Sequence, residues 1–153
     1  MTKKTAFFAI DPAGVKHTRS TAREYTHTVV YLRDKEVALA DAKSDGWRKQ
    51  DGKNYDYYAA CVRDGFHANL MHFDHVRNDL ERQAQDVAFA KTVIGDETRE
   101  QQIARKLAER VAAVEATDFT VWHNAGWCGR LDLAQKVKVY GAAKILILPA
   151  QKA

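Results

Sequence analysis

YTHTVVYL, residues 25–32, is the stretch that decides the fold, because its β-branched and aromatic side chains favour a strand. Upstream, TAFFAI at 5–10 and VKHTRS at 15–20 flank the tetrapeptide DPAG. Within it, Pro12 and Gly14 suit the second and fourth positions of a type I turn, so the two segments predict a β-hairpin. The N-terminal part of the chain is therefore expected to supply three strands.

The pattern becomes helical after this stretch. Asp34 suits the N-cap of a short helix that Gly46 would stop. Residues 47–73 show no clean period, and two Asp-Gly pairs within them resemble turns. We therefore expect a mixture of loop and short helix over 47–73.

Two longer helices are expected next. In the first, apolar side chains recur on one face from a possible cap at Asp74 to residue 94, and Gly95 is the predicted end. The second helix is predicted over 97–116, with charged residues opposite its apolar face. That apolar face consists of Ile103, Leu107, Val111 and Val114.

The last third returns to strand and helix. DFTVWH at 118–123 predicts a strand, RLDLAQKVKVY at 130–140 a helix, and KILIL at 144–148 a strand apolar enough for the middle of a sheet. The whole pattern predicts a single α+β domain over residues 1–153, with a mixed or antiparallel sheet built from N- and C-terminal strands. A central helical segment, about 34–116, would cover this sheet like an insertion.

The composition is that of a globular protein, with 46% hydrophobic and 29% charged residues in a chain of 153. No segment has the character of a secretory signal or a membrane span, so a cytoplasmic protein without membrane contact is expected. Cys61 and Cys128 lie far apart without a CxxC pattern and are expected to be free thiols. The sequence predicts no cofactor.

The net charge of +4 conceals an uneven distribution. Residues 1–33 hold six Lys and Arg against two Asp and Glu, and residues 117–153 hold five against two. Residues 34–116 hold thirteen against sixteen. If the two ends of the chain meet, they form a basic half that favours an anionic partner, although solvated surface is the alternative.

The first candidate site is a row of polar side chains in HTRSTAREYTHTVVY, residues 17–31. One unbroken strand would place alternate side chains on a single face, where Arg suits phosphate or carboxylate and Tyr offers a ring for stacking. The competing interpretation is that STARE, residues 20–24, forms a loop that breaks the register. The residues in question are His17, Arg19, Arg23, Tyr25 and His27.

The second candidate is the cluster His67, His72, Asp74 and His75, whose imidazole and carboxylate groups are weak candidates for a metal site. Their spacing matches no specific metal-binding signature. The alternative is a helix cap at Asp74 with partly exposed histidines beside it.

The third candidate is WHNAGWCGRLDLAQK, which begins at Trp122. A helix start favours anions, and His123 and Arg130 would strengthen that preference, whereas Asp132 opposes it. Cys128 with His123 would also suit nucleophilic catalysis, but no third orienting group is evident.

RSTAREYTHTVV at 19–30 and GWCGRLDLAQKVKVY at 126–140 together resemble a paired pattern in small bacteriophage and prophage proteins that have no known activity. The long middle, 34–116, departs from that pattern. The resemblance implies a viral context in a host cell and contributes no catalytic residue. We therefore expect a phage-type accessory protein that binds nucleic acid or an acidic host protein. The predicted basic surface contains Arg19, Arg23, Tyr25, His27, Trp122, His123 and Arg130.

Two other functions stay open at this point. One is a small enzyme that uses a metal or the Cys128 and His123 pair, although a protein without enzymatic activity is favoured. The other is a homo-oligomeric interaction domain, in which apolar stripes of the central helices form a homodimer.

Overall fold

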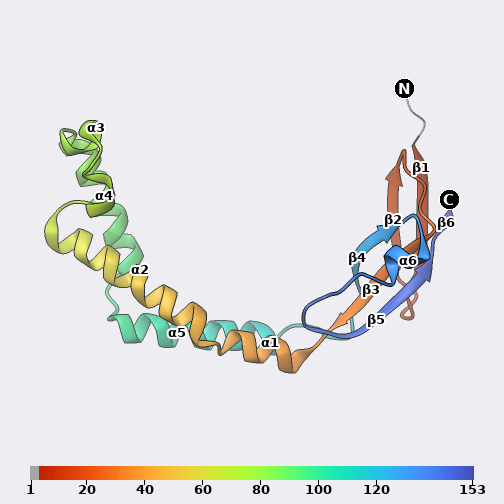
Figure 1. Ribbon diagram of the computed structural model, residues 1–153. Helices are drawn as coiled ribbons and strands as arrows, with labels where there is room; N and C mark the ends of the chain where they lie inside the picture. The colour runs from red at the N-terminus through yellow and green to blue at the C-terminus, as the bar shows by residue number, and fades with distance from the viewer. Residues whose placement is uncertain (1–3) are drawn as a thin grey trace. The chain divides into compact units, whose positions relative to one another are not determined.

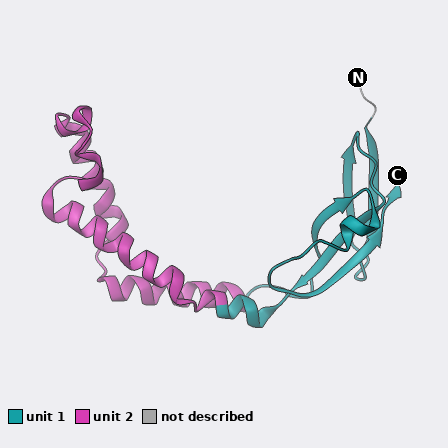
Figure 2. Cartoon of the chain, viewed as in Figure 1, with its two compact units in different colours: residues 1–40, 116–153 teal, residues 41–115 magenta. Residues whose placement is uncertain are grey.

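The chain divides into two compact units in the computed structural model, which describes residues 4–153 (Figure 2). Met1–Ala40 and Ala116–Ala153 form one unit, called the sheet unit here, and Asp41–Glu115 form the other, called the helical unit. The predicted α+β class is confirmed, since strands occur only in the first unit and most helical residues in the second.

Figure 1 follows these elements along the chain. The sheet unit contains β1 (Thr5–Ile10), β2 (Lys16–Thr21), β3 (His27–Arg33), β4 (His123–Cys128), β5 (Ala142–Pro149), β6 (Gln151–Lys152) and the short α6 (Leu131–Ala134). Helix α1 (Lys35–Ala42) leads from it into the helical unit. The helical unit contains α2 (Asp45–Asp64), α3 (Asp74–Arg77), α4 (Leu80–Ile94), α5 (Arg99–Glu115) and the 3₁₀ turn η1 (Ala68–Leu70).

Strands from both ends of the chain pair as predicted, but they form two antiparallel sheets and not one. The first sheet has the order β2-β1-β6 and the second the order β4-β3-β5. The chain passes from the second sheet to the first between β5 and β6. There the Ala150 N–H donates to the Thr26 carbonyl, and the Ala153 N–H donates to the Ala6 carbonyl. One C-terminal segment therefore joins both sheets.

The most buried strand is β3, at the centre of the second sheet. Thr28, Val29 and Val30 are fully enclosed, and the Thr28 hydroxyl donates to the Gly126 carbonyl at 2.8 Å. The prediction that KILIL fills the middle of a sheet is therefore wrong. It belongs to the edge strand β5, where Ile145 is 40% exposed.

The predicted hairpin of β1 and β2 is confirmed, and its strands pair along their whole length. Phe7 and Ala9 point to the buried side, with 1% and 2% of their surface exposed, whereas Ile10 is 56% exposed. In the turn, the Gly14 N–H donates to the Asp11 carbonyl and Gly14 has a φ of 83°, which favours glycine. Turn chemistry and side-chain alternation thus fix this part of the fold locally.

Helix α2 corrects the prediction of mixed loop over 47–73. It runs for 20 residues through both Gly46, the predicted stop of the preceding helix, and Gly52. At Gly52 the Arg99 side chain of α5 lies against the helix backbone: the Arg99 Nε donates to the Gly52 carbonyl at 3.4 Å, and a Cβ at position 52 would lie 2.3 Å from the guanidinium, so a larger residue would displace this side chain. Gly65, in the left-handed conformation, ends the helix.

The predicted helix over 74–94 is interrupted, which corrects the expected cap. Asp74 is the first residue of α3 and pairs with Arg77, while the residue before it makes no side-chain cap. Asp79 is the functional cap, because its carboxylate accepts the Arg82 N–H at 2.9 Å and starts α4. Gly95 ends α4 as predicted.

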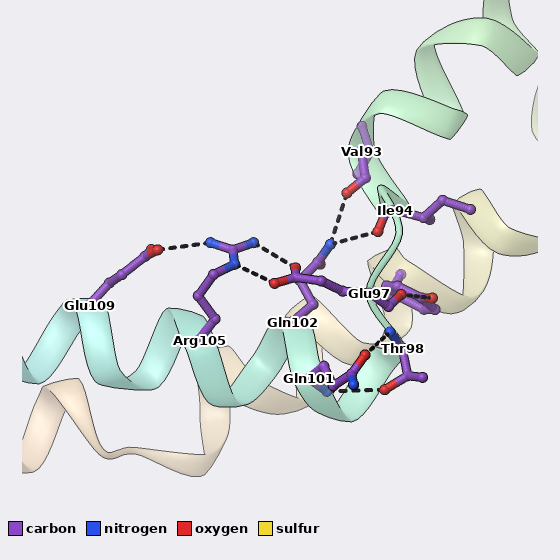
Figure 3. A network of polar contacts seen from close by, with 9 residues as sticks. Val93, Ile94, Glu97, Thr98, Gln101, Gln102, Arg105 and Glu109 are labelled. Carbon is purple, nitrogen blue, oxygen red and sulfur yellow. Dashed lines mark hydrogen bonds and ion pairs between the residues drawn. The ribbon is translucent and has the colours of Figure 1, made fainter.

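The predicted helix over 97–116 is confirmed as α5, and a polar network fixes its start (Figure 3). Thr98 and Gln101 form a capping box: the Thr98 N–H donates to the Gln101 side chain, and the Gln101 N–H donates to the Thr98 hydroxyl. The buried Gln102 amide donates to the carbonyls of Val93 and Ile94 at the end of α4. The Gln102 side chain therefore links α5 to the end of α4 by hydrogen bonds, in addition to the short peptide segment that connects the two helices.

Two C-terminal boundaries also differ from prediction. The strand expected over 118–123 begins only at His123, because Asp118 holds a turn in which its carboxylate accepts the Thr120 N–H at 2.8 Å. The helix expected over 130–140 ends at Ala134, and the β-branched residues at 137 and 139 follow it in turn and coil. Within residues 4–153, no helix combines the length and hydrophobicity that crossing a membrane requires.

Candidate functional site

The predicted row of polar side chains does not lie on one strand. β2 ends at Thr21 in the first sheet and β3 begins at His27 in the second, so a loop separates Arg19 from His27. The competing interpretation, a loop at 20–24 that breaks the register, is confirmed for residues 22–24, whereas Ser20 and Thr21 belong to β2. Arg23 and Tyr25 lie in this loop, and the Arg23 N–H donates to the Thr21 hydroxyl.

Tyr25 lies in an aromatic junction between the two sheets. Its ring stands edge to face with Phe7 at 5.8 Å between centroids and contacts Trp127 at 6.2 Å. The Arg19 guanidinium lies over the same ring at 5.2 Å. The structure therefore brings two predicted site residues, Arg19 and Tyr25, together with Phe7 and Trp127, which the sequence had not associated with them.

Trp122 and His123 lie toward the opposite end of β3 from His27. The pairing of β3 with β4 sets Tyr31 opposite His123 and His27 opposite Cys128. Four residues of strand separate those two pairs, which corresponds to about 13 Å. The seven predicted binding residues therefore occupy two places on the sheet unit.

The place around His123 is also aromatic and basic. Its ring lies 5.5 Å from that of Tyr31, and the Lys144 ammonium lies 6.0 Å from the ring of Trp122, which is only 8% exposed. Nearby in the chain, the Arg33 guanidinium lies over the ring of Phe119 at 5.5 Å. Trp122 is thus a core residue whose ring is contacted by a lysine ammonium group.

Arg130 is a weaker anion ligand than predicted. Its guanidinium binds both carboxylate oxygens of Asp132 at 2.9 and 2.5 Å, and this pairing raises the pKa of Arg130 and lowers that of Asp132. The helix that follows, α6, has four residues, so it offers little helix dipole to an anion. Asp132 opposes anion binding here, as the sequence indicated.

The histidine cluster does not converge on a metal. His67 meets the hydroxyl of Tyr57 in α2, with its Nε2 at 2.8 Å from that oxygen. His72 and His75 instead lie against the ring of Phe73, at 3.9 and 5.7 Å between centroids. Across residues 4–153, no three His, Cys, Asp or Glu side chains are placed to hold a metal ion.

The two cysteines are free and differ in environment. Burial, with the nearby charges of Asp86 and Asp64, raises the pKa of the Cys61 thiol, which disfavours a reactive thiolate. Cys128 is half-buried in β4, opposite His27 and not beside His123. Cys128 and His123 lie at opposite ends of β4, so the pairing of these two residues predicted from the sequence is wrong.

Asp11 is a buried charge that sequence reasoning overlooked. Its carboxylate, 1% exposed, accepts N–H bonds from Ala13 and Val15 at 2.9 and 3.0 Å and meets His17 Nε2 at 2.9 Å. Burial alone would raise the pKa of Asp11, but these hydrogen bonds outweigh it and lower the pKa. The signal was present in DPAG, because Asp at the first position of a turn often accepts such bonds. His17 therefore supports the turn.

The strongest electrostatic feature is the difference between the two units. The sheet unit holds twelve Lys and Arg against six Asp and Glu, or +6, and the helical unit holds twelve against fourteen, or −2. In the helical unit seven of the twelve cations form ion pairs: Arg48, Arg63, Arg77, Arg82, Arg99, Arg105 and Lys106. The sheet unit, in contrast, has twice as many Lys and Arg as Asp and Glu, so its own acidic residues cannot neutralise its positive charge.

Most cations of the sheet unit lack an acidic partner. Among residues 4–153, ion pairs of this unit's Lys and Arg join Lys152 to Glu24 and Arg130 to Asp132. Eight others form no ion pair with a described residue: Lys4, Lys16, Arg19, Arg23, Arg33, Lys136, Lys138 and Lys144. Four of these eight lie over aromatic rings, namely Lys16, Arg19, Arg33 and Lys144. A ring attracts a cation without neutralising it, so the charge stays available.

Comparison with known proteins finds no matching family model, no matching curated protein and no matching solved structure.

Proposed function

We propose that this protein is a phage-type accessory protein whose sheet unit binds nucleic acid through its unmatched positive charge. The observation that carries the proposal is the set of eight Lys and Arg side chains without acidic partners in a unit of charge +6. Cations of this kind replace the counterions condensed on a phosphate backbone, and release of those counterions drives binding.

The aromatic rings beneath four of these cations favour nucleic acid over an acidic protein. Lys16 over Phe8 and Arg19 over Tyr25 place a positive group beside a flat ring that is only partly buried. Nucleic-acid sites combine these two elements, since phosphates need charge and bases need surfaces for stacking. An acidic protein surface needs only the charge.

The viral context rests on the resemblance of residues 19–30 and 126–140 to phage and prophage proteins. Those residues include the loop with Arg23 and Tyr25 and the whole of α6. This support is associational, because a shared pattern does not establish a shared activity.

The test measures binding of a fluorescent 30-nucleotide single strand and a matched duplex by anisotropy between 50 and 200 mM salt. We expect the logarithm of the affinity to fall linearly with the logarithm of the salt concentration. The double variant Arg23→Glu, Lys138→Glu should weaken binding and flatten that slope. A protein with fewer cations in contact with phosphates releases fewer counterions from the nucleic acid when it binds.

The matched control is Lys49→Glu, Lys53→Glu, which makes the same change of charge on exposed residues of α2. It should bind almost as tightly as the natural sequence. Equal loss in the two double variants would mean that net charge alone matters and would contradict a site on the sheet unit. Binding that does not respond to salt, or no binding, would overturn the proposal and favour a protein partner.

A further inference from the structure

The outer face of the first sheet is open and chemically distinct from its inner face. Side chains alternate along β1, so Phe7 and Ala9 are buried while Phe8 and Ile10 point to the other side. Residues directly opposite one another in antiparallel strands share a face. The outer face can therefore be read from the pairing of β1 with its two neighbours.

Phe8 lies at the centre of this outer face. It is paired with Thr18 of β2 on one side and with Gln151 of β6 on the other. The next pairs along the hairpin are Ile10 with Lys16 and Ala6 with Ser20. All of these neighbours are exposed and Phe8 itself is half-buried, so part of its side chain is open to solvent on this face.

A cation lies directly above this ring. The Lys16 ammonium is 4.3 Å from the centroid of Phe8 and forms no ion pair with any residue in 4–153. Lys16 has a flexible four-carbon stem, so its ammonium can leave the ring and follow a phosphate while a flat group takes its place. Thr18 and Gln151, opposite Phe8, and Ser20, opposite Ala6, are exposed on the same face, where their hydroxyl and amide groups can form hydrogen bonds with a base edge.

We propose that the outer face of the first sheet is a stacking platform for single-stranded nucleic acid, with a base on Phe8 and a neighbouring phosphate on Lys16. This inference rests on the proposed function and deepens it, since it names the class of nucleic acid. Bases in a duplex are stacked on one another and cannot lie flat on a protein ring, whereas those of a single strand can.

Charge complementarity selects this occupant over a packed protein element. The neighbours of Phe8 on this face include the cation of Lys16 and several polar side chains. Its apolar neighbours on the face are Ala6 and Ile10. A helix or a second sheet would need a wider apolar surface to bury. A single strand needs one ring for each base and one positive charge for a nearby phosphate.

The test compares a fluorescent 15-nucleotide oligothymidine with a hairpin duplex of equal charge at one salt concentration. The full chain should bind the single strand more tightly. Phe8→Leu, which keeps apolar volume and removes the flat ring, should weaken that binding by about fivefold or more and leave duplex binding unchanged. Phe8→Tyr should retain it.

Ile10→Ala is the matched control, because it truncates an exposed apolar side chain on the same strand and face. It should leave binding of the single strand unchanged. Equal binding of both probes, with no effect of Phe8→Leu, would overturn the platform and leave the proposed function standing. Absence of binding to either probe would overturn both. Failure of Phe8→Tyr to bind while its thermal unfolding is unchanged would also overturn the platform.

Discussion

The sheet unit and the helical unit use large side chains and charges in opposite ways. The largest fully buried side chains, Phe7, Val29, Val30 and Thr28, all belong to the sheet unit. The buried apolar residues of the helical unit are small or medium in size: Ala42, Cys61, Val76 and Ala90. The unit with the larger core leaves its cations without acidic partners, and the unit with the smaller core pairs them.

This difference assigns separate roles to charge in the two units. Arg105 of α5 binds both Glu97 and Glu109, which raises its pKa, and Lys106 binds Asp51 of α2 at 2.9 Å. Of these pairs, Lys106 with Asp51 links α5 to α2, and pairs that are partly exposed to solvent add little to stability. In the sheet unit eight cations are not neutralised by acidic side chains, and four of them contact aromatic rings. We therefore expect core mutations to separate the units most clearly, and charge mutations least.

The largest effect is expected for Phe7→Ala, which empties the core of the first sheet and removes the ring that Tyr25 contacts. The free energy of unfolding of the sheet unit should fall by about 3–5 kcal/mol. Its counterpart Phe89→Ala, at a 58% exposed ring on α4, should cost about 1 kcal/mol or less. Urea unfolding of each variant in a Trp47→Phe background would report the two units, because the remaining Trp122 and Trp127 lie in the sheet unit and the helical circular dichroism comes mostly from the helical unit. Similar losses for both variants would break the comparison.

The next effect concerns the carboxylate of Asp11, whose side chain is 1% exposed, whereas the carboxylates in the ion pairs of the helical unit are between 18% and 81% exposed. Asp11→Ala leaves two backbone N–H groups and His17 without their acceptor, so we expect a loss of about 2 kcal/mol or more. The lowered pKa of Asp11 adds a pH dependence. Its contribution is complete above the unfolded pKa of about 4 and is lost as the pH falls below that value.

Unfolding measured at pH 7 and pH 3 checks this sign. The natural sequence should lose more stability between the two pH values than Asp11→Ala does. An identical pH dependence in both proteins would mean that protonation of the Asp11 carboxylate does not change the free energy of unfolding.

The Gln102→Ala variant tests whether the helical unit can lose stability independently of the sheet unit. The buried amide of Gln102 donates to the Val93 carbonyl at 2.8 Å, so its removal leaves the end of α4 unsatisfied (Figure 3). We expect a loss of about 1–2 kcal/mol in the helical transition and none in the sheet transition. Lys91→Ala, in the exposed last turn of the same helix, serves as the control. A loss in the sheet transition would show that the units unfold together.

The smallest effect is expected from salt. Raising sodium chloride from 0.05 to about 0.5 M screens the exposed pairs of Arg105 and the mutual repulsion of unpaired cations in the sheet unit. The helical transition should therefore shift slightly downward and the sheet transition slightly upward. Thermal unfolding by circular dichroism and fluorescence measures both shifts, and a common direction would contradict the assigned roles of charge.

The sequence predicted elements whose signals are local. The hairpin of β1 and β2, the strand at β3 and the helix at α5 all follow from alternation, turn residues or helical period within a few positions. The helix α2 was missed because Gly52 looks like a turn residue next to Asp51. In the structure Gly52 instead contacts the side chain of Arg99, 47 positions away in the chain, which no local pattern indicates.

The candidate site was predictable in composition but not in geometry. Arg19 and Tyr25 were identified as ligands for a partner, yet their junction with Trp127 depends on the register of β3 against β4. That register joins residues nearly a hundred positions apart, as the bond from Thr28 to Gly126 illustrates. Apolarity likewise indicates that β5 is partly buried but not that it lies at an edge.

The position of the helical unit in the chain has a consequence for folding. β3 ends at Arg33 and its partner β4 begins at His123, so both sheets wait for strands that are synthesised after every helix of the helical unit. Helical contacts are local and form in microseconds to milliseconds, roughly a thousandfold faster than pairing between distant strands. In refolding of a Trp47→Phe variant, the helical signal should return before the fluorescence of Trp122 and Trp127, which lie in the sheet unit. Until then β3 has no partner for Val29 and Val30, which makes the nascent chain prone to aggregation before it is complete.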